Sequence, residues 1–138
     1  MVPTGLNNGT MFHTPGGGWT SHTLATCDGG AQTGTAEEFV ELTGFAIVCV
    51  DFPTAPGSTH PTQETSAVAA VNYVLTNQAN WGLNTGVLAT FGGSAGGHLA
   101  YRVAQLMPGV IDGVVAQAAP TCMSNFGFPT PNGDPRCP

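Results

Sequence analysis

Short apolar runs alternate along the chain with longer segments in which apolar residues recur every three or four positions. The short runs are rich in β-branched and aromatic residues, which predicts strands, whereas the longer spacing predicts amphipathic helices. The predicted strands are 11–13, 45–50, 87–91 and 114–118, and the predicted helices are 35–42, 61–78 and 95–107. This alternation predicts an α/β fold, in which a mostly parallel sheet has helices on both faces.

Turn residues separate these elements and refine the prediction. Gly44 and Asp51-Phe52-Pro53 enclose the run 45–50, whose near-continuous apolar character is typical of a parallel strand buried on both faces, so we expect a central strand there. Pro15 and three glycines follow the first predicted strand, which indicates a loop of special geometry. Residues 121–138 have the composition of a turn-rich tail. We therefore expect one domain over residues 1–138.

The charge balance excludes some classes of partner. The 138 residues include two basic and eight acidic side chains, for a formal net charge of −6. Nucleic acid is a poor partner for such a chain, because phosphate binding requires a basic surface. The longest apolar runs are far shorter than the roughly 20 residues that span a bilayer, so we expect no membrane-spanning segment.

The amino terminus and the four cysteines bear on whether the protein is extracellular. Met1 opens a segment with neither a basic nor an apolar stretch, so we expect no secretory signal in these residues. The scarcity of charge and the glycosylation acceptor Asn8-Gly9-Thr10 lean toward an extracellular protein. Cys49 lies in an apolar run and is predicted to be a buried free thiol. Among the other three we expect at most one disulfide, Cys122 with Cys137, and we find no spacing suited to zinc.

The candidate chemistry lies at Gly92-Gly93-Ser94-Ala95-Gly96, between a predicted strand and a predicted helix. A G-x-S-x-G sequence there is typical of a nucleophile elbow, because small neighbours let strand and helix approach while serine occupies a strained turn. Ser94 would then present its hydroxyl above the carboxyl edge of the sheet. The amide of Ala95, at the positive end of the helix, would face a developing oxyanion. A simpler alternative is a glycine turn in which serine caps the helix.

Three landmarks in order make the chain similar to the hormone-sensitive-lipase-like esterases of the α/β-hydrolase superfamily. The landmarks are Pro15-Gly16-Gly17-Gly18-Trp19, Asp51-Phe52-Pro53-Thr54-Ala55-Pro56 and Gly92-Gly93-Ser94-Ala95-Gly96-Gly97-His98-Leu99-Ala100. The resemblance covers roughly residues 11–120. It implies a partial α/β-hydrolase fold, from the oxyanion loop to the strand after the nucleophile helix.

The resemblance also implies roles for individual residues. Ser94 matches the nucleophile, and the amides of Gly17, Gly18 and Ala95 match the oxyanion hole, with Gly16 as a further neighbour. The family carries histidine directly before its glycines, whereas Pro15 stands there in this chain and His13 lies two positions earlier. This departure affects the shape of the loop, although backbone amides serve regardless of that side chain.

The acid and the base of the family's triad have no counterpart in these residues. The family's chain order is serine, then acid, then histidine, and no histidine follows His98. His98 lies one turn beyond Ser94 on the same helix, and we interpret it as a packed or capping residue because the elbow directs serine away from that helix. Asp112 and Asp134 are interpreted as loop or turn residues, and Asp51 as a structural landmark.

The resemblance implies a carboxylic ester hydrolase acting on a small-molecule ester through an acyl-enzyme on Ser94, with no metal and no cofactor. The chain would then be a central piece of the fold, without the triad acid and base. The alternative is a non-catalytic, truncated or degenerate homologue that binds small molecules or associates through an open sheet edge, since unpaired strands template pairing.

Overall fold

Four parallel strands form the sheet in the computed structural model, which describes residues 1–22, 24 and 36–120. The strands lie in the order β2-β1-β3-β4. Their bounds are Gly9–Thr14 for β1, Phe45–Cys49 for β2, Leu88–Gly93 for β3 and Gly113–Gln117 for β4. Because all the pairings are parallel, the carboxyl ends of the strands meet at one edge of the sheet. The prediction of an α/β fold with a parallel sheet is confirmed.

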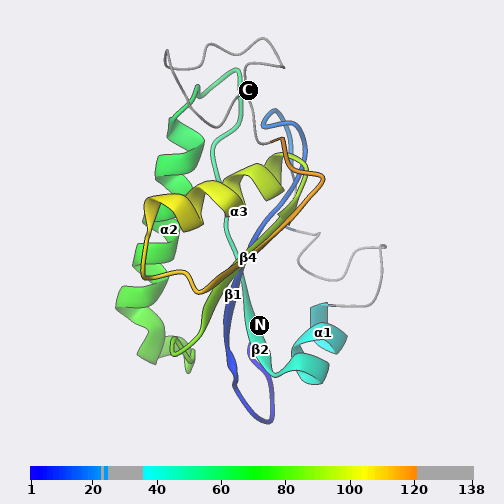
Figure 1. Cartoon of the computed structure of the whole chain (residues 1–138), viewed down its shortest axis with the longest axis vertical. Helices are drawn as coiled ribbons and strands as arrows, with labels where there is room; N and C mark the ends of the chain where they lie inside the picture. Colours follow the sequence, from blue (N-terminus) through cyan, green and yellow to red (C-terminus); the bar gives the residue numbers. More distant parts are fainter. Residues whose placement is uncertain (23, 25–35, 121–138) are drawn as a thin grey trace.

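Three α-helices cover the two faces of this sheet. They are α1 (Ala36–Thr43), α2 (Thr62–Asn77) and α3 (Ala95–Leu106), and a 3₁₀ turn, η2 (Gln78–Trp81), extends α2. Helices α2 and α3 lie on one side of the sheet and α1 lies on the other (Figure 1). This arrangement follows from right-handed crossovers, because the chain moves outward from β1 to β2 and then returns past β1 to β3.

The core lies between the sheet and the α2–α3 layer. Phe12 of β1 is fully buried there and packs in one cluster with Val71 of α2 and Val103 of α3. The apolar spacing of the predicted helix 61–78 is therefore the buried stripe of α2, as expected for an amphipathic helix. This layer fixes the position of α3 against the strands that precede and follow it.

The expectation of a central strand at 45–50 is wrong for the described sheet, since β2 is an edge strand that pairs with β1 alone among the four. Apolar residues fill both of its faces because α1 lies over one face, while Val48 packs on the other against the core cluster. Its outer edge is partly covered by the chain start, where Met1 exchanges backbone hydrogen bonds of 2.9 and 3.0 Å with Ile47. A continuous apolar run indicates that both faces of a strand are covered. It does not indicate how many strands lie beside it in the sheet.

Cys49, at the end of β2, forms a disulfide, so the expectation of a free thiol there is wrong. An apolar run gives no sign of whether a half-buried sulfur has a partner. The predicted pairing of Cys122 with Cys137 lies outside the described residues, as does the tail at 121–138. Among the helices that the structure describes, none has the length and apolar character needed to cross a membrane.

Candidate active site

Ser94 is the single residue between β3 and α3, and its backbone is strained. Its φ of 53° and ψ of −125° lie in a region that side chains other than glycine rarely adopt. The turn is held on both sides, because the Ser94 amide donates to the Gln117 carbonyl (2.9 Å) and the His98 amide donates to the Ser94 carbonyl (3.0 Å). The serine is exposed at the carboxyl edge of the sheet. Strain of this kind persists where the surroundings enforce it, and it concentrates at functional sites.

Two of the three elbow glycines are required by close backbone approach. A Cβ on Gly92 would lie 2.5 Å from the Thr14 carbonyl oxygen and 2.6 Å from the Gly96 carbonyl. A Cβ on Gly96 would overlap the Thr14 carbonyl oxygen. Gly93 differs, because the nearest atom to its Cβ position is 4.0 Å away. The spacing in G-x-S-x-G therefore serves to bring the first turn of α3 against the end of β1.

Thr14 is a member of this arrangement that the sequence analysis did not identify. Its side chain is buried, with the residue only 2% exposed, and its hydroxyl donates to the Gly96 carbonyl oxygen at 2.6 Å. Thr90, in the middle of β3, donates in the same way to the Ala100 carbonyl oxygen at 2.9 Å. The two hydroxyls thus attach α3 to the sheet. The available signal was a threonine two positions after an apolar residue of the core, Thr14 after Phe12 and Thr90 after Leu88.

The glycine loop, residues 16–18, follows β1 and lies beside Ser94. A Cβ on Gly16 would stand 3.7 Å from the Ser94 Cβ and 3.0 Å from the Gly93 carbonyl oxygen. Gly17 and Gly18 have φ of 127° and 63°, values that favour glycine. The carbonyl of Gly17 accepts from the amides of Thr20 (3.2 Å) and Ser21 (3.1 Å), which closes a tight turn. The structure thus brings Gly16 and Ala95 next to Ser94, with Gly17 and Gly18 following Gly16 in the same loop.

His98 and His22 lie near the site and pack against aromatic rings. His98 is 5% exposed, and its ring lies edge-on to Trp19 with the centroids 5.4 Å apart. The interpretation of His98 as a packed residue is thereby confirmed. His22 stacks on Phe52 at 4.3 Å, and its Nε2 lies 2.5 Å from Oδ1 of Asp51. This contact joins the segment after the glycine loop to the segment after β2.

The other two histidines lie on different sides of the sheet. His13, on β1, stacks on Phe91 of β3 with ring centroids 4.5 Å apart, and burial holds the pKa of its imidazole below the ordinary 6.5. His60 precedes α2, and its Nε2 lies 3.2 Å from Oε1 of Glu64. Both rings therefore have partners within the fold.

Asp112 lies at the opposite edge of the sheet from Ser94. Its carboxylate accepts from the Leu88 amide at 2.8 Å, and its own amide donates to the Leu88 carbonyl at 2.8 Å. Asp112 therefore joins the starts of β3 and β4, which is a more specific role than the loop residue that we expected. Asp134 lies outside the described residues.

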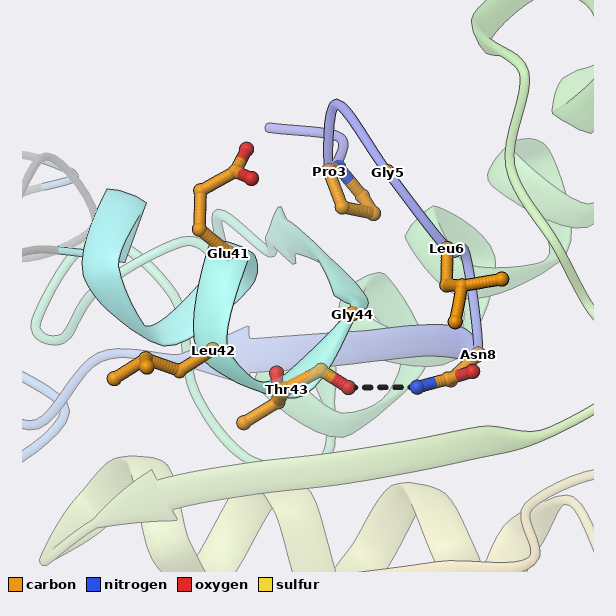
Figure 2. Close-up of a pocket in the computed structure, with 8 residues that line it drawn as sticks. All are labelled: Pro3, Gly5, Leu6, Asn8, Glu41, Leu42, Thr43 and Gly44. Carbon is orange, nitrogen blue, oxygen red and sulfur yellow. Dashed lines mark hydrogen bonds between the residues drawn. The ribbon is translucent and has the colours of Figure 1, made fainter.

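A hollow of about 200 Å³ also lies at the amino edge of the sheet, away from Ser94. Figure 2 shows that its walls come from the segment before β1 and from the end of α1.

Asn8 and Thr10, two residues of the predicted glycosylation acceptor, have structural roles nearby. Asn8 donates to the Thr43 carbonyl (2.8 Å), and the hydroxyl of the buried Thr10 donates to the Asn84 carbonyl (2.7 Å).

The part of the chain that the structure describes, residues 1–22, 24 and 36–120, has no candidate metal site. Within that part, no three side chains among histidine, cysteine, aspartate and glutamate are grouped so that they could hold an ion.

Comparison with known proteins agrees with this geometry. An esterase of Gibberella moniliformis is 26% identical over 127 residues, which are 87% of this chain and 37% of that esterase. The solved esterase of Pyrobaculum calidifontis is 25% identical with a TM-score of 0.75, over 91% of this chain and 40% of that one. A thermostable carboxylesterase cloned from a metagenomic library is 28% identical with a TM-score of 0.64, over 73% of this chain and 33% of that one.

The chain therefore spans well under half the length of these relatives. The family model that matches it, BD-FAE, extends over residues 7–122, from the segment before β1 to beyond β4. Together with the parallel sheet and the serine turn between β3 and α3, this match shows that the chain belongs to the BD-FAE family of α/β-hydrolase esterases.

Proposed function

We propose that this chain carries the nucleophile and the oxyanion-binding amides of a carboxylic ester hydrolase, with Ser94 as the nucleophile. The strained, exposed backbone of Ser94 is the observation that carries the proposal. A serine that served only as a helix cap would bond its hydroxyl to an amide of the first turn of α3, and the Ser94 side chain makes no such capping bond in the described structure. The esterase relatives support the same chemistry at the level of the family.

In the proposed reaction, the Ser94 oxygen attacks the carbonyl carbon of a small ester and loses its proton to a base. The amides of Ala95, Gly17 and Gly18 bind the oxygen that becomes negative, with Gly16 beside them. The tetrahedral intermediate then expels the alcohol, which takes up the proton and leaves an acyl group on Ser94. Water cleaves that acyl-enzyme, so that the carboxylic acid leaves and the serine hydroxyl returns.

The general base of this reaction is proposed to lie outside the 138 residues. The family order places the histidine after the acid and the acid after the serine, and the printed sequence has no histidine beyond His98. The buried His98 packs against Trp19, and His22 pairs with Asp51. We therefore expect Ser94 in the isolated chain to react slowly, as a positioned but weakly activated hydroxyl.

The test is to incubate the purified chain with a fluorophosphonate probe and with p-nitrophenyl acetate, next to Ser94→Ala. Slow labelling of the parent chain that disappears in Ser94→Ala supports the assignment. Labelling that persists in Ser94→Ala excludes Ser94 as the nucleophile. Peptide mapping of the labelled chain identifies the modified residue directly.

A second candidate function is association without catalysis, and the exposure of β4 favours it. Every residue of β4 is exposed, and Val114 and Val115 have 40% and 60% of their surface accessible among the described residues. β4 is an edge strand of the described sheet, and the unpaired backbone groups of an edge strand template pairing with another chain. On this alternative the isolated chain dimerises or aggregates, and a monomer in sedimentation equilibrium would contradict it.

A further inference from the structure

A buried carboxylate lies beside the helix that follows Ser94. Glu64, in the first turn of α2, is only 4% exposed. Arg102 of α3 binds it with two parallel hydrogen bonds, Nε to Oε1 at 2.9 Å and Nη2 to Oε2 at 3.0 Å. His60 and His98 direct their Nε2 atoms at the same Oε1, at 3.2 and 3.9 Å. One acidic side chain therefore meets three side chains that can be cationic.

His98 connects this cluster to the glycine loop. Its ring lies between the Glu64 carboxylate and the indole of Trp19, which it meets edge-on at 5.4 Å. Trp19 comes directly after Gly18, and its carbonyl accepts from the Ala55 amide at 2.7 Å. The backbone of His98 in turn donates to the Ser94 carbonyl at 3.0 Å. His98 thus contacts both Trp19, the residue after the glycine loop, and the turn at Ser94.

Stability alone does not account for a charged pair at this position. A buried ion pair gains little free energy of folding over well-packed apolar side chains, because both ions lose their hydration. An apolar contact between α2 and α3 would join the helices equally well, as Val71 and Val103 already do. The two hydrogen bonds from Arg102 fix the orientation of the Glu64 carboxylate, since hydrogen bonds to a carboxylate are directional, and His98 contacts that fixed carboxylate at 3.9 Å, beyond hydrogen-bond distance.

We infer that Glu64 and His98 are positioning residues, which hold Trp19 and with it the glycine loop in register with Ser94. This inference rests on the proposed function, because the loop matters to the reaction only if its amides bind the oxyanion. The chain of contacts runs from Arg102 and Glu64 through the imidazole of His98 to the indole of Trp19. Loss of any link is expected to leave Ser94 in place and to displace the loop.

Two variants separate positioning from folding. The double replacement Glu64→Leu with Arg102→Leu removes both charges together, so the helices keep an apolar contact. His98→Leu removes the link to Trp19 and fills most of the same volume. Glu41→Leu is the matched control, because the Glu41 carboxylate binds Thr4 at the opposite edge of the sheet, through its amide (3.0 Å) and its hydroxyl (2.9 Å).

Two measurements are made on each variant in a Trp81→Phe background, which leaves Trp19 as the single indole. The first is the second-order rate of fluorophosphonate labelling at Ser94, and the second is acrylamide quenching of Trp19 fluorescence. We expect both replacements to slow labelling about tenfold, since small displacements in an active site are costly, and to raise the quenching of Trp19. Thermal unfolding of the double variant should stay close to that of the parent.

The results distinguish the inference from the proposed function. Unchanged Trp19 quenching in both variants overturns the inference, whether or not Ser94 reacts. If the parent labels at Ser94 and both variants label at the same rate as the parent, the inference is also overturned, while the proposed nucleophile stands. A parent that never labels at Ser94 refutes the proposed function, and the quenching data then decide by themselves whether Glu64 and His98 fix Trp19. Slower labelling in the Glu41→Leu control would attribute the effect to general loosening and would likewise reject the inference.

Discussion

The hydroxyl of Thr14 donates a 2.6 Å hydrogen bond to the carbonyl oxygen of Gly96, and so joins the last residue of β1 to the first turn of α3. The same two residues are in close backbone contact, because a Cβ on Gly96 would overlap the Thr14 carbonyl. The relation between them sets how closely α3 approaches the strand that precedes the glycine loop. Replacement of Thr14 therefore tests how the site is held together.

Thr14→Val is expected to lower the free energy of unfolding by about 1–2 kcal/mol, because a buried carbonyl loses its hydrogen-bond donor while the side-chain volume is kept. Labelling of Ser94 should slow in parallel. Urea denaturation followed by circular dichroism measures the first effect. Thr76→Val is the control, since the exposed Thr76 bonds only within its own helix, to the Asn72 carbonyl. Equal losses in the two variants would contradict a special role for Thr14.

Alanine replacements in the elbow should separate the three glycines. Gly92→Ala and Gly96→Ala each place a methyl group against backbone, and we expect each to cost about 1–3 kcal/mol of stability and to reduce Ser94 labelling. Gly93→Ala has room and should be close to neutral on both measures. Thermal unfolding and labelling of the three purified variants are the measurements. A Gly93→Ala variant as damaged as the other two would refute the proposed packing of the elbow.

His13 should make stability depend on pH. Burial holds its pKa below 6.5, so the unfolded chain takes up the proton at a higher pH than the folded chain does. Its contribution to stability is therefore complete above pH 6.5 and decreases as the pH falls through the lowered pKa. His13→Phe keeps a ring against Phe91 and should flatten the dependence between pH 7 and 5, as measured by urea unfolding at each pH. If the free energy of unfolding depends on pH in this variant as it does in the parent, groups other than His13 cause the dependence.

The disulfide at Cys49 is expected to contribute about 2–4 kcal/mol of stability, mainly by restricting the unfolded chain. A reductant should therefore lower the unfolding temperature of the parent chain. Cys49→Ser should start from a lower unfolding temperature and respond less to the reductant. Calorimetry with and without the reductant compares the two, and an equal response would show that the Cys49 disulfide does not stabilise the fold.

The sequence predicted the local features of this chain because they depend on neighbouring residues. The alternation of strands and helices, the end of α1 at Gly44 and the serine turn at Ser94 all follow from short-range pattern and backbone preference. The parallel pairing followed from the alternation itself. The resemblance to a family rested on three short sequence landmarks, which are likewise local.

Features that join distant residues were not predicted, because no short-range pattern encodes them. Glu64 meets Arg102 across 38 positions, and Thr14 meets Gly96 across 82. The edge position of β2 depends on the order of strands, which is a property of the whole sheet. The importance of Glu64, Arg102 and Thr14 follows from what the fold places opposite each of them.

Strands β1 and β3 are direct neighbours although α1, β2 and α2 lie between them in the chain, and the pairing places Thr14 opposite Gly92. The glycine loop and the serine turn therefore leave the sheet from adjacent strands, about 5 Å apart. The pairing that brings the two parts together is made by these two strands themselves and does not depend on the length of the segment between them. We therefore expect β1 and β3, together with the glycine loop and the serine turn, to be retained as one structural unit while other parts of the fold vary.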